Sequence, residues 1–411
     1  MKQFSINNTF ALGGWVTPTG DLLNEKTFKD IAESGINLLF CSIVPRNDFE
    51  GVKKFAGYSE KYGLKVVLDV TEVAEDDFDE KDFLVRLDFY KKTSCIIGLS
   101  LGDEPGLKSI PKIEKAAKYL RKIKGDLFLY LNNLPIYATK EQLNGGWWTP
   151  EAKELENKEY DEFIDEMTAR SGVDVLSYDH YPFRGNPGES DPRYFVQLSL
   201  TSEIAEKYNL PLFNFTQVTS WKKGEVRNTT LAEISCLCGT SVCYGVTGLV
   251  YFCCCTPASG VEQFEKAMID EYGNKTESFY SVKAVNERLK TVFDCIFGAE
   301  RKGIIVAGRC FAEVPEKDRI QSFGDLKKIE GDGFIVGCFE KKHSEIYLIV
   351  NVSVCSDNVI KLKFDNNSEK KIYLAESESL SEDGLVVSVE AGGFVVVVDN
   401  QESYEKNRVA D

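Results

Sequence analysis

The chain has 411 residues, of which 43% are hydrophobic and 28% are charged, an ordinary composition for a globular protein. Its 65 Asp and Glu residues outnumber its 49 Lys and Arg residues, so the formal net charge is −16. This charge argues against a nucleic acid partner, whose phosphates would be repelled, whereas a neutral or cationic partner is easier to accommodate. The length exceeds a usual single core, which predicts one large domain and a smaller one.

The amino-terminal residues lack the apolar stretch of a secretion signal, and no later segment approaches 18 uninterrupted apolar residues. We therefore expect a cytoplasmic protein with no membrane partner, although removal of an export signal would leave the same sequence. Twelve cysteines are present, but the usual zinc spacings are absent and the histidines are only His180 and His343. Buried free thiols in a reducing compartment, with no metal and no organic cofactor, are the expectation.

Apolar runs of strand length alternate with amphipathic helical stretches over the first 300 residues. The expected strands are 10–16, 36–43, 64–70, 95–101, 127–131, 173–178, 210–216 and 247–253. The expected helices are 25–34, 49–62, 80–93, 110–124, 160–170, 192–208, 231–239 and 277–297. Eight strand–helix pairs predict an α/β fold, a (β/α)8 TIM barrel over residues 1–300.

After residue 300 the long helical patterns stop and short alternating runs begin. The expected strands are 303–307, 333–339, 345–352, 359–364, 371–375, 385–389 and 393–398, separated by Gly-, Asp- and Asn-rich turns. This pattern predicts a small all-β sandwich over residues 301–400. Residues 401–411 form a polar tail.

The fourth expected strand ends abruptly in the sequence Gly-Asp-Glu-Pro, residues 102–105. A carboxylate at the carboxyl end of a strand is how a β/α barrel presents catalytic groups. Counting by twos, Glu104 shares a face with the small residues Gly98 and Ser100, which suit a crowded barrel interior, and Asp103 shares the other face with large aliphatic residues. Regular alternation therefore points Glu104 toward the barrel mouth, although an ordinary turn would use the same residues.

The other strand ends carry acids, amides and aromatic rings, which together suit a sugar, because amides and acids bind hydroxyls and ring faces stack on C–H faces. A carbohydrate substrate is the expected partner, and the oligomeric state is left open. The candidate substrate-binding residues are Trp15, Asp69, Asp103, Asn132, Asn133, Trp148, Tyr178, His180, Tyr181, Asn214, Gln217, Trp221 and Tyr251. For His180, the sequence favours a structural role and a role in the site equally.

The Asp-Glu-Pro segment resembles the Asn-Glu-Pro signature of the large clan of barrel glycoside hydrolases that includes β-galactosidases, β-glucosidases and cellulases. The residues Tyr-Asp-His-Tyr-Pro after strand six and the run 245–252 resemble the corresponding strands of these enzymes, and the sandwich resembles their accessory domain. The resemblance implies that Glu104 is the acid/base and that Asp103 binds a sugar hydroxyl.

One departure from this clan concerns strand seven, where the family carries a nucleophilic glutamate. Here the strand ends in Gln217, and an amide cannot act as a carboxylate nucleophile. The candidates for a second acid are Asp179, Asp69, Glu72 and Asp103. Asp179 shares its face with the small Ser177, so we expect Glu104 and Asp179 to be the catalytic pair, with retention or inversion left open.

Three hypotheses follow from these residues. The first is a glycoside hydrolase that cleaves a glycosidic bond in an oligo- or polysaccharide, with Glu104 as general acid. The second is a catalytically degenerate barrel that acts as a carbohydrate-binding protein, motivated by the missing strand-seven acid. The third, a metal-dependent barrel hydrolase or isomerase, is weakened because such sites usually need several histidines.

Overall fold

The computed structural model describes residues 1–146, 159–186, 189–221, 225–257, 263–342, 344–365, 369–381 and 384–400. The loop tryptophans Trp147 and Trp148, His343 and the polar tail 401–411 lie outside these residues. The predicted roles of Trp148 and the tail therefore stay predictions.

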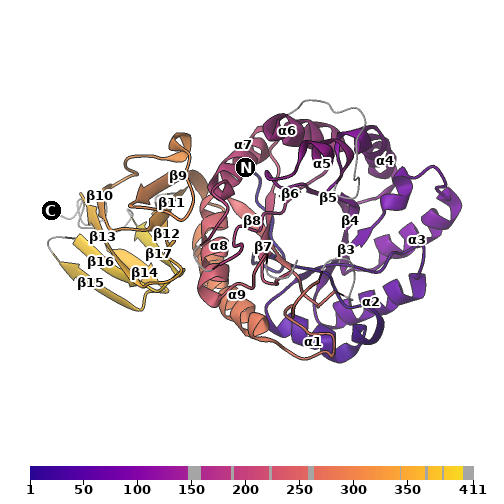
Figure 1. Ribbon diagram of the computed structural model, residues 1–411, viewed down its shortest axis with the longest axis horizontal. Coiled ribbons are helices and arrows are strands. Elements are labelled where there is room, and N and C mark those ends of the chain that lie inside the picture. Colours follow the sequence, from indigo (N-terminus) through magenta and orange to yellow (C-terminus); the bar gives the residue numbers. More distant parts are fainter. Residues whose placement is uncertain are drawn as a thin grey trace. The chain divides into compact units, whose positions relative to one another are not determined.

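Eight parallel strands close into a barrel in chain order (Figure 1). They are β1 (Ala11–Trp15), β2 (Leu38–Phe40), β3 (Lys65–Asp69), β4 (Ile96–Asp103), β5 (Phe128–Asn133), β6 (Leu176–Tyr178), β7 (Leu212–Gln217) and β8 (Val246–Phe252). Each ends within three residues of the end of an expected strand, so the prediction of a (β/α)8 barrel is confirmed. The carboxyl ends of all eight strands meet at one face, where barrel enzymes place their sites.

The helices of the barrel follow the strands in sequence. They are α1 (Glu25–Glu33), α2 (Phe49–Lys61), α3 (Glu80–Lys92), α4 (Ile110–Ile123), α5 (Lys140–Gly145), α6 (Tyr160–Ser171), α7 (Tyr194–Lys207), α8 (Leu231–Cys243) and α9 (Glu277–Ile296). Gly35, Gly63 and Gly172 lie at or after three helix ends with positive φ angles of 87°, 70° and 64°, the conformation that favours glycine where a helix ends. The short helix α5 was missed, because its six residues are too few to show a helical period.

Large rings from alternate strands fill the interior of the barrel. A Cβ atom at Gly98 would lie 2.6 Å from the Phe128 ring, and one at Gly248 would lie 2.3 Å from the Phe213 ring. These glycines therefore make room for the two rings, as expected for small residues facing a crowded interior. Phe4, before β1, packs edge-on against both rings at 5.4 Å and closes the end of the barrel where the strands begin.

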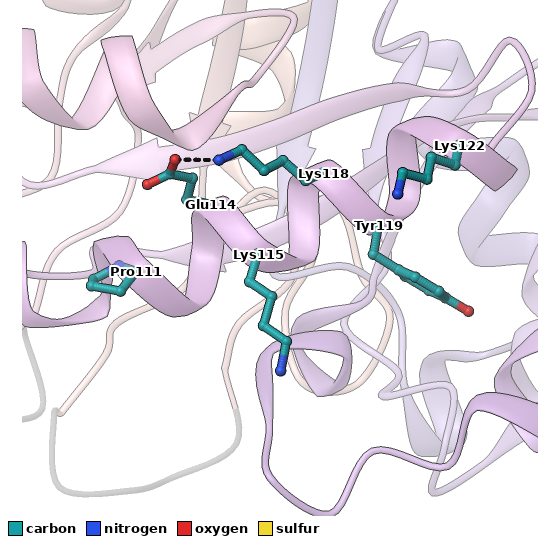
Figure 2. Close-up of a pocket in the computed structure, with 6 residues that line it drawn as sticks. All are labelled: Pro111, Glu114, Lys115, Lys118, Tyr119 and Lys122. Atoms are coloured by element: carbon teal, nitrogen blue, oxygen red, sulfur yellow. Dashed lines mark hydrogen bonds and ion pairs between the residues drawn. The ribbon is translucent and has the colours of Figure 1, made fainter.

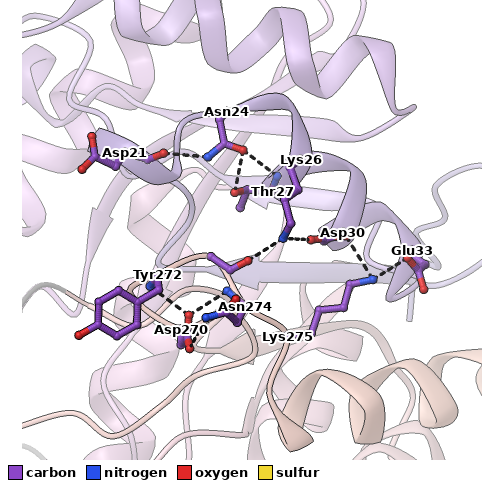
Figure 3. Close-up of polar contacts among 11 residues, drawn as sticks. Asp21, Asn24, Lys26, Thr27, Asp30, Glu33, Asp270, Tyr272, Asn274 and Lys275 are labelled. Atoms are coloured by element: carbon purple, nitrogen blue, oxygen red, sulfur yellow. Dashed lines mark hydrogen bonds and ion pairs between the residues drawn. The ribbon is translucent and has the colours of Figure 1, made fainter.

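The segment between β8 and α9 is tied to α1 by a polar network (Figure 3). The Lys26 ammonium donates to Asp30 at 2.8 Å and to the carbonyl of Gly273 at 2.7 Å. Lys275 pairs with Asp30 at 3.2 Å and with Glu33 at 2.7 Å. These contacts hold a loop of the carboxyl face against the first helix.

The carboxyl-terminal strands form two antiparallel sheets. One has the order β10 (Leu326–Glu330), β13 (Asn358–Phe364), β16 (Gly384–Val389) and β15 (Ser377–Ser381); the other has β14 (Lys370–Tyr373), β17 (Phe394–Asn400), β12 (Ser344–Asn351), β11 (Phe334–Lys341) and β9 (Glu300–Ala307). The expected β-sandwich is confirmed. The sequence missed β10 and β15, the two edges of one sheet, because edge strands are often charged or polar and lack a clear alternation of apolar residues.

By internal contacts the chain divides into two compact units. One comprises Met1–Tyr181, Leu200–Asn228 and Thr247–Tyr280, and the other comprises Pro182–Ser199, Thr229–Val246 and Ser281–Asp411. All site residues discussed below belong to the first unit. The expected domain boundary near residue 300 stays a prediction.

The twelve cysteines are free thiols, and nine of them are buried, as the sequence suggested. Within the described parts of the chain, none of the helices is both long enough and apolar enough to cross a membrane.

Candidate active site

A β-bulge near the end of β4 changes which side chains face the barrel interior. Ser100 lies opposite Tyr130, and Asp103 lies opposite Asn132, so β4 has one more residue than β5 between these two pairs. The extra residue shifts the alternation of β4 by one position. Asp103, which regular alternation would direct away from the interior, therefore joins the inward-facing residues of the site.

Glu104 follows the bulge with a positive φ of 46°, which is unusual for a residue other than glycine. Its amide donates a hydrogen bond of 2.9 Å to the carbonyl of Asn132, which fixes the backbone at this point. Such a conformation costs on the order of 1–3 kcal/mol and persists at functional sites where the surroundings enforce it. The bulge and this turn together allow both neighbouring acids to face the barrel mouth.

The Glu104 carboxyl forms a hydrogen bond with the carboxyl of Asp179, which follows β6. Asp179 is only 5% exposed, and burial raises its pKa to about 7. The Glu104 hydrogen bond lowers the pKa of Asp179 and the Asp103 charge raises it. The two carboxyl groups therefore interact directly, and burial makes Asp179 harder to ionise than an ordinary aspartate.

The side chain of Asn132 links two acids, one at the end of β4 and one after β6. Its side-chain amide donates to Asp103 Oδ1 at 3.1 Å and to Asp179 Oδ1 at 3.3 Å. The side-chain oxygen Oδ1 of Asn132 accepts a hydrogen bond of 3.2 Å from the Ser177 hydroxyl. That hydroxyl lies 2.7 Å from the Tyr130 hydroxyl. The amide orientation is thereby fixed. Sequence reasoning did not single out Tyr130 or Ser177 as site residues, although their inward parity on β5 and β6 was readable.

A pocket of about 190 Å³ lies at the ends of β1 to β4. It is lined by Trp15, Phe40, Cys41, Ser42, Val44, Val67, Asp69, Ser100, Gly102 and Asp103. The Trp15 and Phe40 rings lie 5.0 Å apart and form an aromatic wall. Three of the predicted site residues, Trp15, Asp69 and Asp103, therefore share one pocket.

The two acids of this pocket are both harder to ionise than usual. Burial raises the pKa of Asp69, whose Oδ1 accepts bonds from the Thr71 amide at 3.2 Å and hydroxyl at 2.8 Å. The pKa of Asp103 is raised to about 6 by burial, and the charge of Asp69 adds to the rise. Asp103 nevertheless has an exposed surface. A carboxylate surrounded by protein at the bottom of an open pocket satisfies both observations.

A second set of aromatic rings lies near the carboxyl pair. Tyr181 packs edge-on against Trp221 at 4.9 Å, and its ring is tilted by 43° against that of Phe252 at 5.3 Å. Burial raises the pKa of Tyr181 well above its usual value, and the charges of Asp179 and Glu104 contribute. The Tyr181 ring therefore lies close to the pair, in a cluster of buried aromatic side chains.

Several predicted site residues are buried away from this arrangement. Tyr178 and His180 alternate with Ser177 and Asp179, and the His180 ring packs edge-on against Tyr137 at 5.2 Å. The Asn133 amide donates to the Ser177 carbonyl at 2.7 Å.

Asn214 and Tyr251 also lie at strand positions whose side chains point away from the barrel interior. Asn214 alternates with the interior rings Phe213 and Phe215, and Tyr251 alternates with Val250 and Phe252. Their contacts with substrate stay predictions.

Gln217 ends β7, which contains no acid. Its side-chain amide is buried and donates a hydrogen bond of 2.6 Å to the carbonyl of Arg227. The residue at the position of the expected glutamate thus fastens the following loop. A glutamate there could not donate this bond when ionised.

A wider hollow of about 540 Å³ lies along the outer face of α4 (Figure 2). It is lined by Pro111, Glu114, Lys115, Lys118, Tyr119 and Lys122, and Glu114 pairs with Lys118 at 2.6 Å. All of these residues come from one helix, and none of them lies at the carboxyl end of a strand. We therefore do not assign the candidate site to this hollow.

Only one group of three candidate metal ligands was found among the described residues, and it comprises Asp325, Glu345 and Asp399. This group belongs to the sandwich. The buried ammonium of Lys370 lies 2.8 Å from Asp399 and supplies positive charge there. The carboxyl pair of the barrel belongs to no such group.

Comparison with known proteins places this arrangement in context. Residues 154–292 match the glycoside hydrolase family 42 model, described as β-galactosidase. No curated protein matches the chain. The fold resembles a catalytic mutant of Gan42B, a GH42 β-galactosidase from G. stearothermophilus, with a TM-score of 0.65 and 10% identity over 97% of this chain and 99% of that one.

Two further β-galactosidases share the fold. The enzyme of Bacillus circulans sp. alkalophilus has a TM-score of 0.64 and 8% identity over 95% of this chain and 99% of that one. The enzyme of the psychrophilic Marinomonas ef1 has a TM-score of 0.51 and 10% identity over 69% of this chain, and the chain spans 60% of its length.

The chain is similar to barrel glycoside hydrolases. The resemblance stated from the Asp-Glu-Pro segment is thereby confirmed, and the matched model supports the expected class of enzyme, a glycoside hydrolase. At identities near 10%, the structural likeness extends to the fold, and the substrate and mechanism have to be argued from this chain's own residues.

Proposed function

We propose that the protein hydrolyses glycosidic bonds in an oligo- or polysaccharide. The observation that carries this proposal is the hydrogen-bonded pair of Glu104 and Asp179 at the carboxyl face of a (β/α)8 barrel. Two carboxyl groups, one protonated and one ionised, are the groups that glycoside hydrolysis requires. The aromatic rings near the pair supply surfaces on which sugar rings can stack.

In the proposed mechanism Glu104 donates its proton to the oxygen of the leaving sugar. Retaining enzymes hold their two carboxyl groups about 5–5.5 Å apart and inverting enzymes about 6.5–9.5 Å, so direct contact is closer to the retaining arrangement. Asp179 then attacks the anomeric carbon as the bond to the leaving oxygen breaks, forming a glycosyl ester. In the second step the Glu104 carboxylate takes a proton from water, whose oxygen displaces Asp179.

The residues predicted to contact substrate fall into groups according to where they lie. Trp15, Asp69 and Asp103 line the pocket beside the pair and are proposed to bind the sugar that is cleaved. Tyr181 and Trp221 lie in the aromatic cluster near the pair and are proposed to shape the other side of the cleft. Asn132 is proposed to position the acids.

A cytoplasmic location stays part of the proposal. Its support is the set of twelve free thiols, which suits a reducing compartment.

The alternative function is a carbohydrate-binding protein on a degenerate barrel. The observation that favours it is Gln217, whose amide is committed to a structural bond where related enzymes carry a nucleophile. In this case Glu104 and Asp179 would bind sugar hydroxyls without transferring a proton.

A screen with aryl glycosides separates the two functions. Because the structural relatives named above are β-galactosidases, β-galactosides are the first substrates to test, followed by other β-glycosides. Release of the aryl group, with the anomer of the first product read by NMR, would support hydrolysis and give its stereochemistry. Calorimetric binding of sugars without release of any aryl group would support the alternative.

A further inference from the structure

The pocket beside the carboxyl pair contains two acids and lacks a cation. Asp69 and Asp103 both line it, and the charge of Asp69 acts on Asp103. Neither forms an ion pair with a lysine or arginine in the described ranges. The charge of Arg46 lowers the pKa of Asp69 without a direct contact. The guanidinium of Arg46 pairs with Asp77, at 3.8 Å. Two clustered carboxylates without a counter-ion favour a cationic ligand.

A buried hydroxyl also faces this pocket. Ser100 lines the pocket and is 7% exposed, and its hydroxyl makes no hydrogen bond with any residue that the structure describes. Its oxygen is not among the fully buried atoms without a partner, so the hydroxyl opens into the pocket and is available to a ligand. It lies on β4 next to the bulge that turns Asp103 inward.

The wall of the pocket is aromatic. Trp15 and Phe40 pack together at 5.0 Å, and both rings line the space that the two acids face. Aromatic faces attract cations through the ring quadrupole, and an ammonium group between such rings and carboxylates is the usual form of this recognition. A metal ion is less suited to this place, since no third acidic, histidine or cysteine ligand joins the two acids in the part of the chain that was described.

The size and position of the pocket restrict the ligand further. Its volume of about 190 Å³ lies below the roughly 300–1,000 Å³ of pockets for drug-sized ligands, so it suits a single sugar unit. Asn132 donates to both Asp103 and Asp179, so the pocket adjoins the catalytic pair. A group bound here belongs to the sugar held at the pair.

We propose that this pocket binds the protonated amino group of an amino sugar, with Asp103 and Asp69 as counter-ions and Ser100 as a hydrogen-bond partner. The preferred substrate is then a glycoside of a hexosamine with a free amino group, not an N-acetylated one. This inference rests on the proposed function, because it names the sugar at the same site. An N-acetyl group carries no charge and would leave both carboxylates without a counter-ion.

The test compares matched substrates and matched variants of the full chain. The substrates are 4-nitrophenyl β-D-glucosaminide, β-D-glucoside and N-acetyl-β-D-glucosaminide, together with the galactosaminide and galactoside. We expect kcat/KM for an amino sugar to exceed that of its neutral partner by about 10-fold or more, as for a charge-assisted contact. Asp103→Asn and, separately, Asp69→Asn should reduce this ratio, whereas Asp21→Asn, on the exposed surface, should preserve it.

Binding measurements keep the inference separate from the proposed function. Calorimetry with glucosamine, galactosamine, glucose and N-acetylglucosamine is done with the native protein and with Glu104→Gln. Tighter binding of the amino sugars without hydrolysis of any glycoside would support this pocket and overturn the proposed function. Hydrolysis of neutral glycosides at a rate equal to or higher than that of amino sugar glycosides would support the proposed function and overturn the amino-group pocket. A preference for amino sugars that is unchanged in both Asp variants would also overturn the pocket.

Discussion

The carboxyl groups of Glu104 and Asp179 are joined by a hydrogen bond, although their strands, β4 and β6, are separated in the barrel by β5. The intervening strand contributes Asn132, whose amide contacts Asp179 at 3.3 Å and Asp103 at 3.1 Å. The pair is thus held from three strands, and each of the following predictions depends on this arrangement.

Glu104→Gln should lower kcat by a factor of about 10²–10⁴, since it removes the proton donor and keeps the size of the side chain. Steady-state rates with aryl glycosides, measured beside circular dichroism spectra, test this expectation. Glu75→Gln is the matched control, because Glu75 is exposed on the loop after β3 and should retain full activity. Undiminished turnover in the Glu104 variant would remove the central claim of the mechanism.

Asp179→Ala should abolish hydrolysis and leave room for a small external nucleophile. If Asp179 is the nucleophile of a retaining enzyme, added azide should restore cleavage of an activated aryl glycoside and give a glycosyl azide of inverted configuration. Product analysis by NMR identifies the anomer. With Glu104→Gln azide should instead attack the glycosyl ester and give a glycosyl azide of retained configuration, and an inverted product from the native protein would contradict retention.

The acid limb of activity should lie near pH 7, because Asp179, with a pKa of about 7, must be ionised to attack. Removal of the Asp103 charge in Asp103→Asn lowers the pKa of Asp179, so the limb should move to lower pH. A profile of kcat/KM from pH 4 to 9 measures the shift. An unchanged or higher limb would show that Asp103 does not act on the pair.

Asp179→Asn should stabilise the protein at pH 8 and have little effect at pH 4. The folded pKa of Asp179 is raised, so its protonated form favours folding, and this contribution is lost as the pH rises from about 4 through 7. Replacement by an uncharged amide avoids that loss. Thermal unfolding should show a Tm increase of about 2 °C or more at the higher pH only. A variant that is less stable at pH 8 would mean that the carboxylate is stabilised in the folded protein.

Gln217→Glu should destabilise the protein by about 1–3 kcal/mol, because the buried carbonyl of Arg227 loses its donor. Urea unfolding at pH 7 measures the change in the free energy of unfolding, and Gln321→Glu, at an exposed position, is the control. If the variant instead gained activity without losing stability, strand seven would retain a competent nucleophile position and the structural role of Gln217 would be wrong.

The periodic parts of the molecule were readable without coordinates. The eight barrel strands are short apolar runs buried on both faces, and the helices that follow them carry their own caps, such as Asn24 before α1 and Asp48 before α2. These are local properties of neighbouring residues. The same locality explains why Glu104, at a strand end before a proline, could be singled out.

By itself, then, the sequence determined the barrel, the sandwich and the strand ends at which acids and rings gather. Only the tertiary structure decided that Asp103 turns inward, that Asn132 bridges two acids and that Gln217 binds a loop. The physical reason is that a single extra residue in β4 reverses the alternation, and that hydrogen bonds between separate strands depend on closure of the barrel. Neither effect leaves a periodic signal in the chain.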